Sequence, residues 1–295
     1  MSKTEDIDGS AAPLIEHLIE LRNRLMWAVG SYVVAIIAVF VVAEPILTYM
    51  LHPIEQAMRA LGDPHPVMQY TAPQEYFFTL VRISMVMGLA AAFPVISYQL
   101  WRFVAPGLYR SEKAAFLPFL IASPVLFILG AGFAHYVVTP IAMGFFLGFA
   151  DASSVVAAII PSMTGAADGA PAVADTGIDI VFQGKVNETL DIALKLIIAF
   201  GLCFQLPVLL TLMGKAGLVT SSGLIATRKY AVVLILILAA LMTPPDVMSQ
   251  MILFSAVYPL YEVSIILIRR IEKRREAELR AEGLWDEADD EEAAK

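Results

Sequence analysis

Residues 17–43 read HLIELRNRLMWAVGSYVVAIIAVFVVA, and this stretch decides what kind of fold the chain can adopt. Its second part, 25–43, has nineteen residues without a charge. Because about 20 apolar residues in a helix cross the hydrocarbon layer of a membrane, this part predicts a membrane-spanning helix. The first part, 17–24, is predicted to form an amphipathic helix at the membrane surface, since leucines recur on one helical face from Leu14 to Leu25. The chain therefore enters the membrane through a charged helix.

The composition extends this interpretation to the whole chain. It is 58% hydrophobic and 16% charged, with a mean hydropathy of +0.72, which is too apolar for an ordinary soluble domain of 295 residues. The runs of apolar residues predict six spans, at about 25–45, 77–98, 114–138, 190–214, 229–243 and 247–268. The last two should be short, because the 13 residues between Lys229 and Thr243 make only about 20 Å of helix. We therefore expect an all-α membrane protein with six transmembrane helices.

The positive charges predict the orientation of these spans. Of the 20 Lys and Arg residues, 16 fall in four places: before Leu25, between Tyr98 and Lys113, between Lys215 and Lys229, and after Ile268. Because Lys and Arg are enriched in cytoplasmic segments, both termini and two alternate loops are predicted to be cytoplasmic. Two termini on one side require an even number of spans, which agrees with six.

The segments outside the spans are predicted from their composition. Residues 1–12 are expected to be disordered, 13–270 to form the six-span membrane domain, and 271–295 to form a charged cytoplasmic tail. The outer link 44–75 contains five prolines, which predicts an ordered connection interrupted by turns rather than a long helix. The outer link 151–185, rich in Ala, Gly, Ser, Pro and Asp, is predicted to be an elaborated loop. The first apolar run is too long for a cleaved signal peptide, so we expect it to be retained.

Charges beside or within the spans have simple structural interpretations. Glu20 and Arg24 are spaced to form an i,i+4 pair on one helix, so Glu20 can be explained as part of a membrane anchor. Asp191 and Lys195 have the same spacing. Arg82 lies early in the second span and is predicted to reach the membrane interface with its long side chain.

Two further polar residues leave alternatives open. Ser111 is a predicted N-cap with Glu112 in the first turn of the third helix, which is a sufficient structural role for Glu112. Gln205 lies mid-span beside Pro207, where an amide needs a partner. We predict that this partner is a polar group on a partner protein's transmembrane helix. The alternative is a bond within this chain that bridges the backbone freed by Pro207. The one cysteine, Cys203, excludes an intramolecular disulfide and a cage of several thiolates.

Several motifs on different loops carry a family resemblance. They are HLIELRNRL at 17–25, Phe93-Pro94 with Gln99, FVAPGLY at 103–109 with Glu112, Phe200-Gly201 with Pro207, and LMTPPDV at 241–247 with Gln250. In this order, over about Pro13 to Arg270, they closely resemble the TatC family. That family provides the multi-span receptor subunit of the twin-arginine protein translocase.

The resemblance implies a cupped six-helix scaffold without catalytic chemistry, so neither an enzyme activity nor a cofactor or metal is expected. It implies recognition of paired arginines in the signal peptides of folded cargo proteins, which cross the membrane with the proton-motive force. The implied partners are these signal peptides, small single-span translocase subunits, further copies of the chain and membrane lipid, with no nucleic acid. The implied location is the bacterial inner membrane.

The resemblance also implies site residues. Its signal-peptide contacts correspond to Glu20, Glu112, Phe103, Arg22 and Tyr109; the contact with a partner helix to Gln205 and Pro207; and the structural positions to Pro94, Pro244, Pro245 and Asp246. Two carboxylates on separate cytoplasmic segments can each bind one guanidinium through paired hydrogen bonds. This chain departs from the family at Gln205, where many members have Glu, so no protonatable group is required there.

Two other functions compete with this interpretation. A small-solute or ion secondary transporter would need charges at the membrane midplane or broken helices in an internal repeat, and the two halves of the chain show no repeat. A membrane-embedded enzyme would need a catalytic or metal-ligating set, but the four histidines are dispersed along the sequence without ligand spacing.

Overall fold

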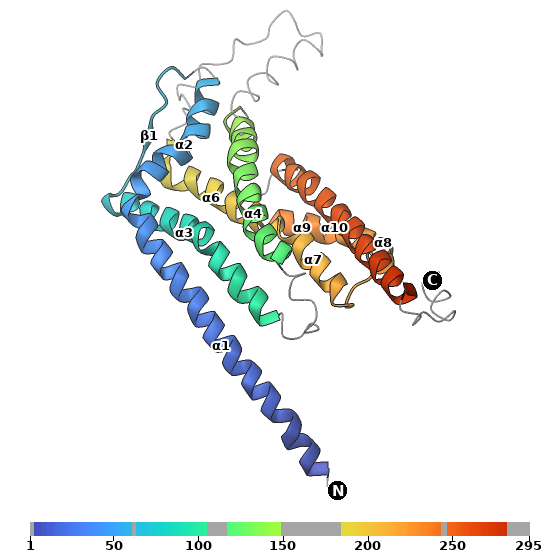
Figure 1. Ribbon diagram of the computed structural model, residues 1–295. Coiled ribbons are helices and arrows are strands. Elements are labelled where there is room, and N and C mark those ends of the chain that lie inside the picture. The colour runs from blue at the N-terminus through green and yellow to red at the C-terminus, as the bar shows by residue number, and fades with distance from the viewer. Residues whose placement is uncertain (1–2, 61–62, 105–116, 149–183, 243–246, 282–295) are drawn as a thin grey trace, which may run out of the picture.

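The computed structural model describes residues 3–60, 63–104, 117–148, 184–242 and 247–281, and nearly all of them are helical. The elements are α1 (Lys3–Val41), α2 (Ala43–Ala60), β1 (Met68–Gln69), α3 (Pro73–Val104), α4 (Leu117–Phe133), the π-helical turn η3 (Ala134–Val138), β2 (Gly184–Lys185), α6 (Val186–Cys203), α7 (Leu206–Lys215), α8 (Ser221–Ala226), α9 (Arg228–Met242) and α10 (Val247–Ala281). β1 and β2 pair in parallel, with Met68 opposite Gly184. Figure 1 shows α1 running beside α3 at one edge of the bundle.

Within the described residues, five helical segments are long and apolar enough to cross a membrane. They are His17–Val41, Pro73–Phe103, Pro118–Gly148, Val186–Lys215 and Ser249–Glu278. The sixth apolar helix, α9, has 15 residues, or about 22 Å of length, and is therefore short as the sequence predicted. The chain is thus a multi-pass membrane protein, and the crossing by α9 stays a prediction.

Three predicted boundaries differ from the structure. α1 begins at Lys3, inside the segment 1–12 for which the sequence predicts disorder. Adding turns to an existing helix costs far less than starting one. α2 is an 18-residue helix within the outer link, where no long helix was expected. α10 continues to Ala281, beyond the boundary predicted at 270.

The error at α2 has an identifiable cause. Prolines often break helices, but a proline in the first turn, such as Pro45, removes a donor that the helix does not need. Pro53 lies inside the helix, and there the burial of one apolar face offsets its cost. That face includes Leu47, Met50 and Ile54, all at most 6% exposed.

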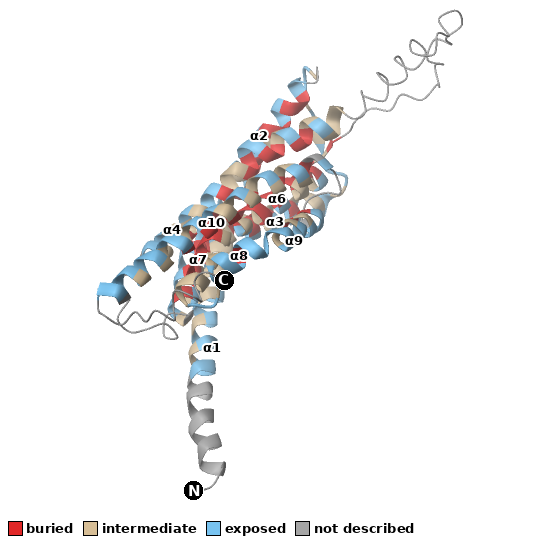
Figure 2. Cartoon of the chain, turned by 90° about the vertical axis from the view of Figure 1, so that its right-hand side faces the viewer, coloured by how far each residue is buried: buried red, intermediate tan, exposed pale blue. Residues whose placement is uncertain are grey.

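The core is centred on α6. Leu190, Leu194, Ile197 and Phe200 of this helix are at most 2% exposed, and α4, η3 and α3 pack against it. Figure 2 shows this buried centre and the largely exposed surface of α1. In the membrane-crossing part of α1 no residue is buried, so this helix lies at the periphery.

Charged residues mark two levels along the bundle. Three pairs of charged residues lie twenty positions apart along the chain: Arg24 in α1 and Glu44 at the start of α2, Arg82 and Arg102 in α3, and Lys195 in α6 and Lys215 in α7. Twenty residues of helix rise about 30 Å, which is the thickness of the hydrocarbon layer. We call the level of Arg24, Arg102 and Lys215 the basic end, and the level that carries α2, β1 and β2 the α2 end.

Candidate functional site

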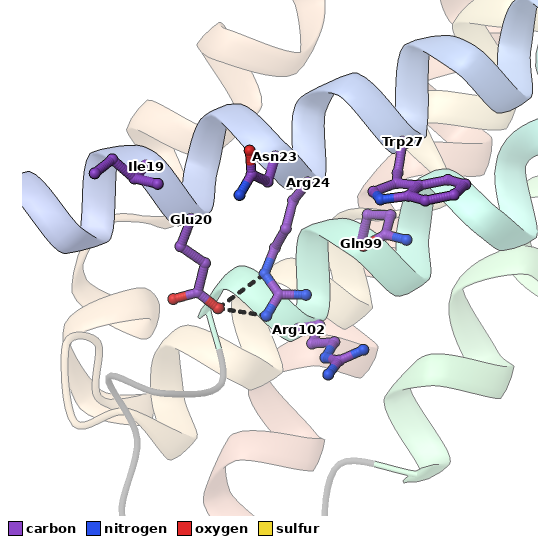
Figure 3. A pocket seen from close by; sticks show the side chains of 7 residues that line it. All are labelled: Ile19, Glu20, Asn23, Arg24, Trp27, Gln99 and Arg102. Carbon is purple, nitrogen blue, oxygen red and sulfur yellow. Dashed lines mark hydrogen bonds and ion pairs between the residues drawn. The ribbon is translucent and has the colours of Figure 1, made fainter.

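At the basic end, α1 and α3 form an open cleft of about 640 Å³ (Figure 3). It is lined by Ile19, Glu20, Asn23, Arg24 and Trp27 of α1 and by Gln99 and Arg102 of α3. Side chains three or four positions apart lie on the same face of a helix, which explains why positions 20, 24 and 27 meet positions 99 and 102. Trp27 is 71% exposed at the apolar edge of the cleft, the depth at which tryptophan is common in membrane proteins.

Glu20 is the only carboxylate that lines the cleft among the described residues, and it is bound to Arg24. The Nε of Arg24 donates to Oε1 of Glu20 at 3.0 Å, and its Nη2 donates to the same oxygen. Within the described part of the chain, no other hydrogen bond reaches Glu20. The i,i+4 pair predicted from the sequence is therefore confirmed, and it leaves Oε2 of Glu20 without a donor from the described residues.

Phe103, near the C-terminal end of α3, contacts His17 of α1. Its ring stacks on the imidazole of His17, with 4.3 Å between centroids and an angle of 18° between the planes. The structure thus brings Phe103 and Glu20, two predicted site residues from separate helices, to one end of the bundle. Arg22 does not line the cleft; its Nη2 donates to Oδ1 of Asn23 at 3.4 Å on the exposed side of α1.

The rest of the predicted peptide-binding set lies outside the described residues, namely Tyr109 and Glu112. The charge of the described cleft indicates that binding a cationic guest would require a second carboxylate or the displacement of an arginine. Glu20 faces two cations, Arg24 and Arg102, and the latter lies over the ring of Tyr98 at 5.9 Å from its centroid. The described cleft alone therefore carries a surplus positive charge, and a cationic guest would need either another acidic group or the displacement of an arginine.

Gln205 lies where the long span Val186–Lys215 breaks between α6 and α7. Pro207 lacks a backbone N–H, so the regular helical bond to the carbonyl of Cys203 cannot form, and α7 starts at Leu206. The amide of Gln205 instead binds Ser123 of α4. Ser123 Oγ donates to Oε1 of Gln205 at 2.6 Å, and Nε2 of Gln205 donates to the carbonyl oxygen of Ser123 at 2.9 Å. Of the two alternatives for this amide, the bond within the chain is present.

Replacing Gln205 with leucine should therefore destabilise the isolated protein. Two hydrogen bonds between α4 and the α6–α7 break would be lost, at a cost of about 0.5–2 kcal/mol in a membrane. The measurement is the thermal unfolding of the detergent-solubilised protein, with Ser123→Ala as the matched variant. Both substitutions remove the bond from Ser123 Oγ to Gln205 Oε1, whereas only Gln205→Leu also removes the bond to the backbone carbonyl of Ser123. The double variant should therefore lose less than the sum of the two single losses. Wild-type stability of Gln205→Leu would contradict this role.

The predicted structural residues are described only in part. Pro94 lies inside α3, where its neighbour Phe93 stacks on Phe127 of α4 at 4.1 Å between ring centroids. Pro244, Pro245 and Asp246 lie outside the described residues.

The structure contains a charge network between α3 and α6 that the sequence did not predict. Arg82 was expected only to reach the membrane interface, but its Nη1 lies 2.7 Å from Oδ1 of Asp191 on α6, and Nζ of Lys195 lies 2.7 Å from Oδ2. The pairing of Asp191 with Lys195 is confirmed. The link to Arg82 joins residues 109 positions apart, and no local pattern in the sequence predicts such a pair. Among the described residues, no three metal-ligating side chains gather.

The chain is similar to proteins of one family. The family model for "Sec-independent protein translocase protein (TatC)" matches residues 16–255, which include the cleft and Gln205. A protein of that name from Magnetococcus marinus is 42% identical over 275 residues, covering 93% of this chain and 90% of the relative. The namesake from Aquifex aeolicus is 33% identical, covering 86% and 94%. A crystal structure of the twin-arginine translocase receptor TatC superposes with a TM-score of 0.67 at 32% identity, covering 86% of this chain and 98% of that one.

Proposed function

This chain belongs to the TatC family, and on that premise we propose that it is the twin-arginine receptor of a Sec-independent protein translocase, with the cleft between α1 and α3 as part of its receptor site. The observation that carries the proposal is the position of Glu20, a partly exposed carboxylate in an open cleft at the basic end. Family membership does not favour the alternative of a small-solute transporter.

The proposed ligand is the arginine pair of a signal peptide on a folded cargo protein. A guanidinium presents several N–H donors in one plane and binds carboxylates through parallel hydrogen bonds, which a lysine ammonium cannot reproduce. Glu20 would take one arginine, and Glu112, on the link that follows α3, would take the other. Phe103, Arg22 and Tyr109 would contact the same peptide. Trp27 at the apolar edge would meet the hydrophobic part of the peptide.

The proposed partners extend beyond the signal peptide. Members of this family work with other translocase subunits, and we propose small single-span subunits and further copies of the chain. Gln205 remains a candidate contact together with Pro207, since the amide still has a second N–H that Ser123 does not use. Transport driven by the proton-motive force would involve this whole assembly, in which the chain binds and positions cargo.

The test of the proposed function is peptide binding to the purified protein in lipid nanodiscs. A fluorescent signal peptide with its arginine pair should bind saturably, and the same peptide with a lysine pair should bind markedly more weakly. Equal affinity for both peptides would contradict recognition of guanidinium groups.

We also propose that the basic end is cytoplasmic, in the inner membrane of a bacterium, with six spans and both termini on that side. The excess of Lys and Arg at this end supports the orientation. Single cysteines introduced by Asp63→Cys, Asp168→Cys and Asp286→Cys in a Cys203→Ala background would be exposed to an impermeant thiol reagent on intact cells. Labelling is expected at positions 63 and 168 and not at 286. The opposite pattern would reverse the orientation.

A further inference from the structure

We propose that Arg24 is an internal ligand of Glu20, which the arginine of a signal peptide has to displace before it can bind. This inference rests on the proposed function of the cleft and adds a regulatory contact to it. In the structure, the receptor carboxylate is already occupied by the same chemical group that the guest would bring.

The contact differs from the other arginine–glutamate pairs at i,i+4 spacing. In the pair of Arg59 with Glu55, the side chains are 54% and 47% exposed, and in the pair of Arg274 with Glu278 they are 84% and 62% exposed. In the pair of Arg24 with Glu20 they are only 16% and 33% exposed. A less exposed pair is screened less by water and salt, so it competes more effectively with a ligand than a solvated surface pair does.

The geometry places the contact inside the cleft. Figure 3 shows the guanidinium of Arg24 turned back along α1 toward Glu20, with Arg102 across from it on α3. Both Nε and Nη2 of Arg24 converge on Oε1 of Glu20, so one carboxylate oxygen is occupied and Oε2 is the atom at which a guest can begin. Arg102 is bound to a different group: its Nη1 donates to the hydroxyl of Tyr98 at 3.4 Å.

Binding would therefore be an exchange of one guanidinium for another. The arginine of the guest takes over the carboxylate, and the long side chain of Arg24 is released toward water. The guest has to break the pair of Arg24 with Glu20 before it binds. Its affinity is therefore lower than for an unpaired Glu20, by a factor set by the equilibrium constant of that pair. Such a receptor holds its guest reversibly and can reclose on Glu20 when the cargo moves on. Without a guest, Glu20 stays paired with Arg24.

The experiment measures the affinity of the twin-arginine signal peptide for four proteins in nanodiscs: wild type, Arg24→Gln, Glu20→Gln and the double variant. Removing an internal pair of this kind should tighten binding about two- to fivefold in Arg24→Gln. The tightening should be smaller when Glu20 is already neutral, because the competition is then absent. Melting temperatures of the four proteins check that each is folded.

The possible outcomes distinguish displacement of Arg24 from an effect of bulk charge and from a positioning role of Arg24. A gain in Arg24→Gln that shrinks in the Glu20→Gln background supports displacement. An equal gain in both backgrounds would assign the effect to bulk charge, and unchanged or weaker binding would mean that Arg24 holds Glu20 in position for the guest; either overturns the inference. If Glu20→Gln alone leaves the affinity of the wild type intact, the proposed receptor site itself is wrong, whatever Arg24 does.

Discussion

Alanine at Gly130 should lower the free energy of unfolding by about 1–3 kcal/mol, the usual cost of forcing an extra group into a packed core. A Cβ atom there would lie 2.5 Å from the carbonyl oxygen of Phe200 and 2.8 Å from Cγ of Phe204. A backbone carbonyl cannot rotate away as a side-chain tip can, so α4 and α6 would have to separate. Small residues at such crossings let the backbones of membrane helices approach closely. The measurement is thermal unfolding in detergent.

The matched control is Gly132→Ala on the same helix. A Cβ at Gly132 would meet no atom within 4 Å, so this variant adds the same methyl group without a clash. Its stability should equal that of the wild type or exceed it slightly, because alanine favours helix over glycine. If Gly130→Ala and Gly132→Ala unfold at the same temperature, the close crossing of α4 and α6 is not a determinant of stability.

The sequence predicts the long apolar helices, since their signal is local. Runs of about 20 apolar residues identify spans by length alone, and the shortness of α9 followed from counting residues between Lys229 and Thr243. The prolines of 44–75 argue against a long helix, whereas Leu47, Met50 and Ile54 of α2 recur with helical spacing. That periodicity was available in the sequence and would have predicted the helix.

The candidate site could be predicted only in outline. The pairing of Glu20 with Arg24 follows from i,i+4 spacing, and so it was foreseen. The bonds of Gln205 to Ser123, the pairing of Arg82 with Asp191 and the stacking of His17 on Phe103 each join helices far apart in the sequence. Such contacts depend on how helices pack, which a single sequence does not encode in any local pattern.

Neutralising either receptor carboxylate should weaken the binding of a twin-arginine signal peptide about 10- to 150-fold. A hydrogen bond to a charged group contributes about 1.5–3 kcal/mol, and each of Glu20→Gln and Glu112→Gln removes one such contact while keeping the size of the side chain. Both variants should stay folded in the membrane. For Glu20→Gln this follows because the side chain of Glu20 is one-third exposed on a peripheral helix, where losing an ion pair costs little stability. The measurement is the dissociation constant in nanodiscs.

Glu55→Gln provides the control for this pair of variants. Glu55 also forms an i,i+4 pair, with Arg59, but it lies in α2 at the opposite end of the bundle. Its replacement removes the same charge without touching the cleft, so peptide affinity should stay at the wild-type value. A loss of affinity in Glu55→Gln equal to that in Glu20→Gln would mean that the net charge of the protein, rather than the cleft, controls binding.

The central claim is that two carboxylates at the basic end hold the arginine pair, and the double variant Glu20→Gln/Glu112→Gln tests it most directly. One measurement suffices: the ratio of its dissociation constants for the twin-arginine and the twin-lysine signal peptide, compared with the wild-type ratio. We expect the wild type to prefer arginine clearly and the folded double variant to bind both peptides weakly and about equally. A double variant that keeps the wild-type preference for arginine would contradict the account.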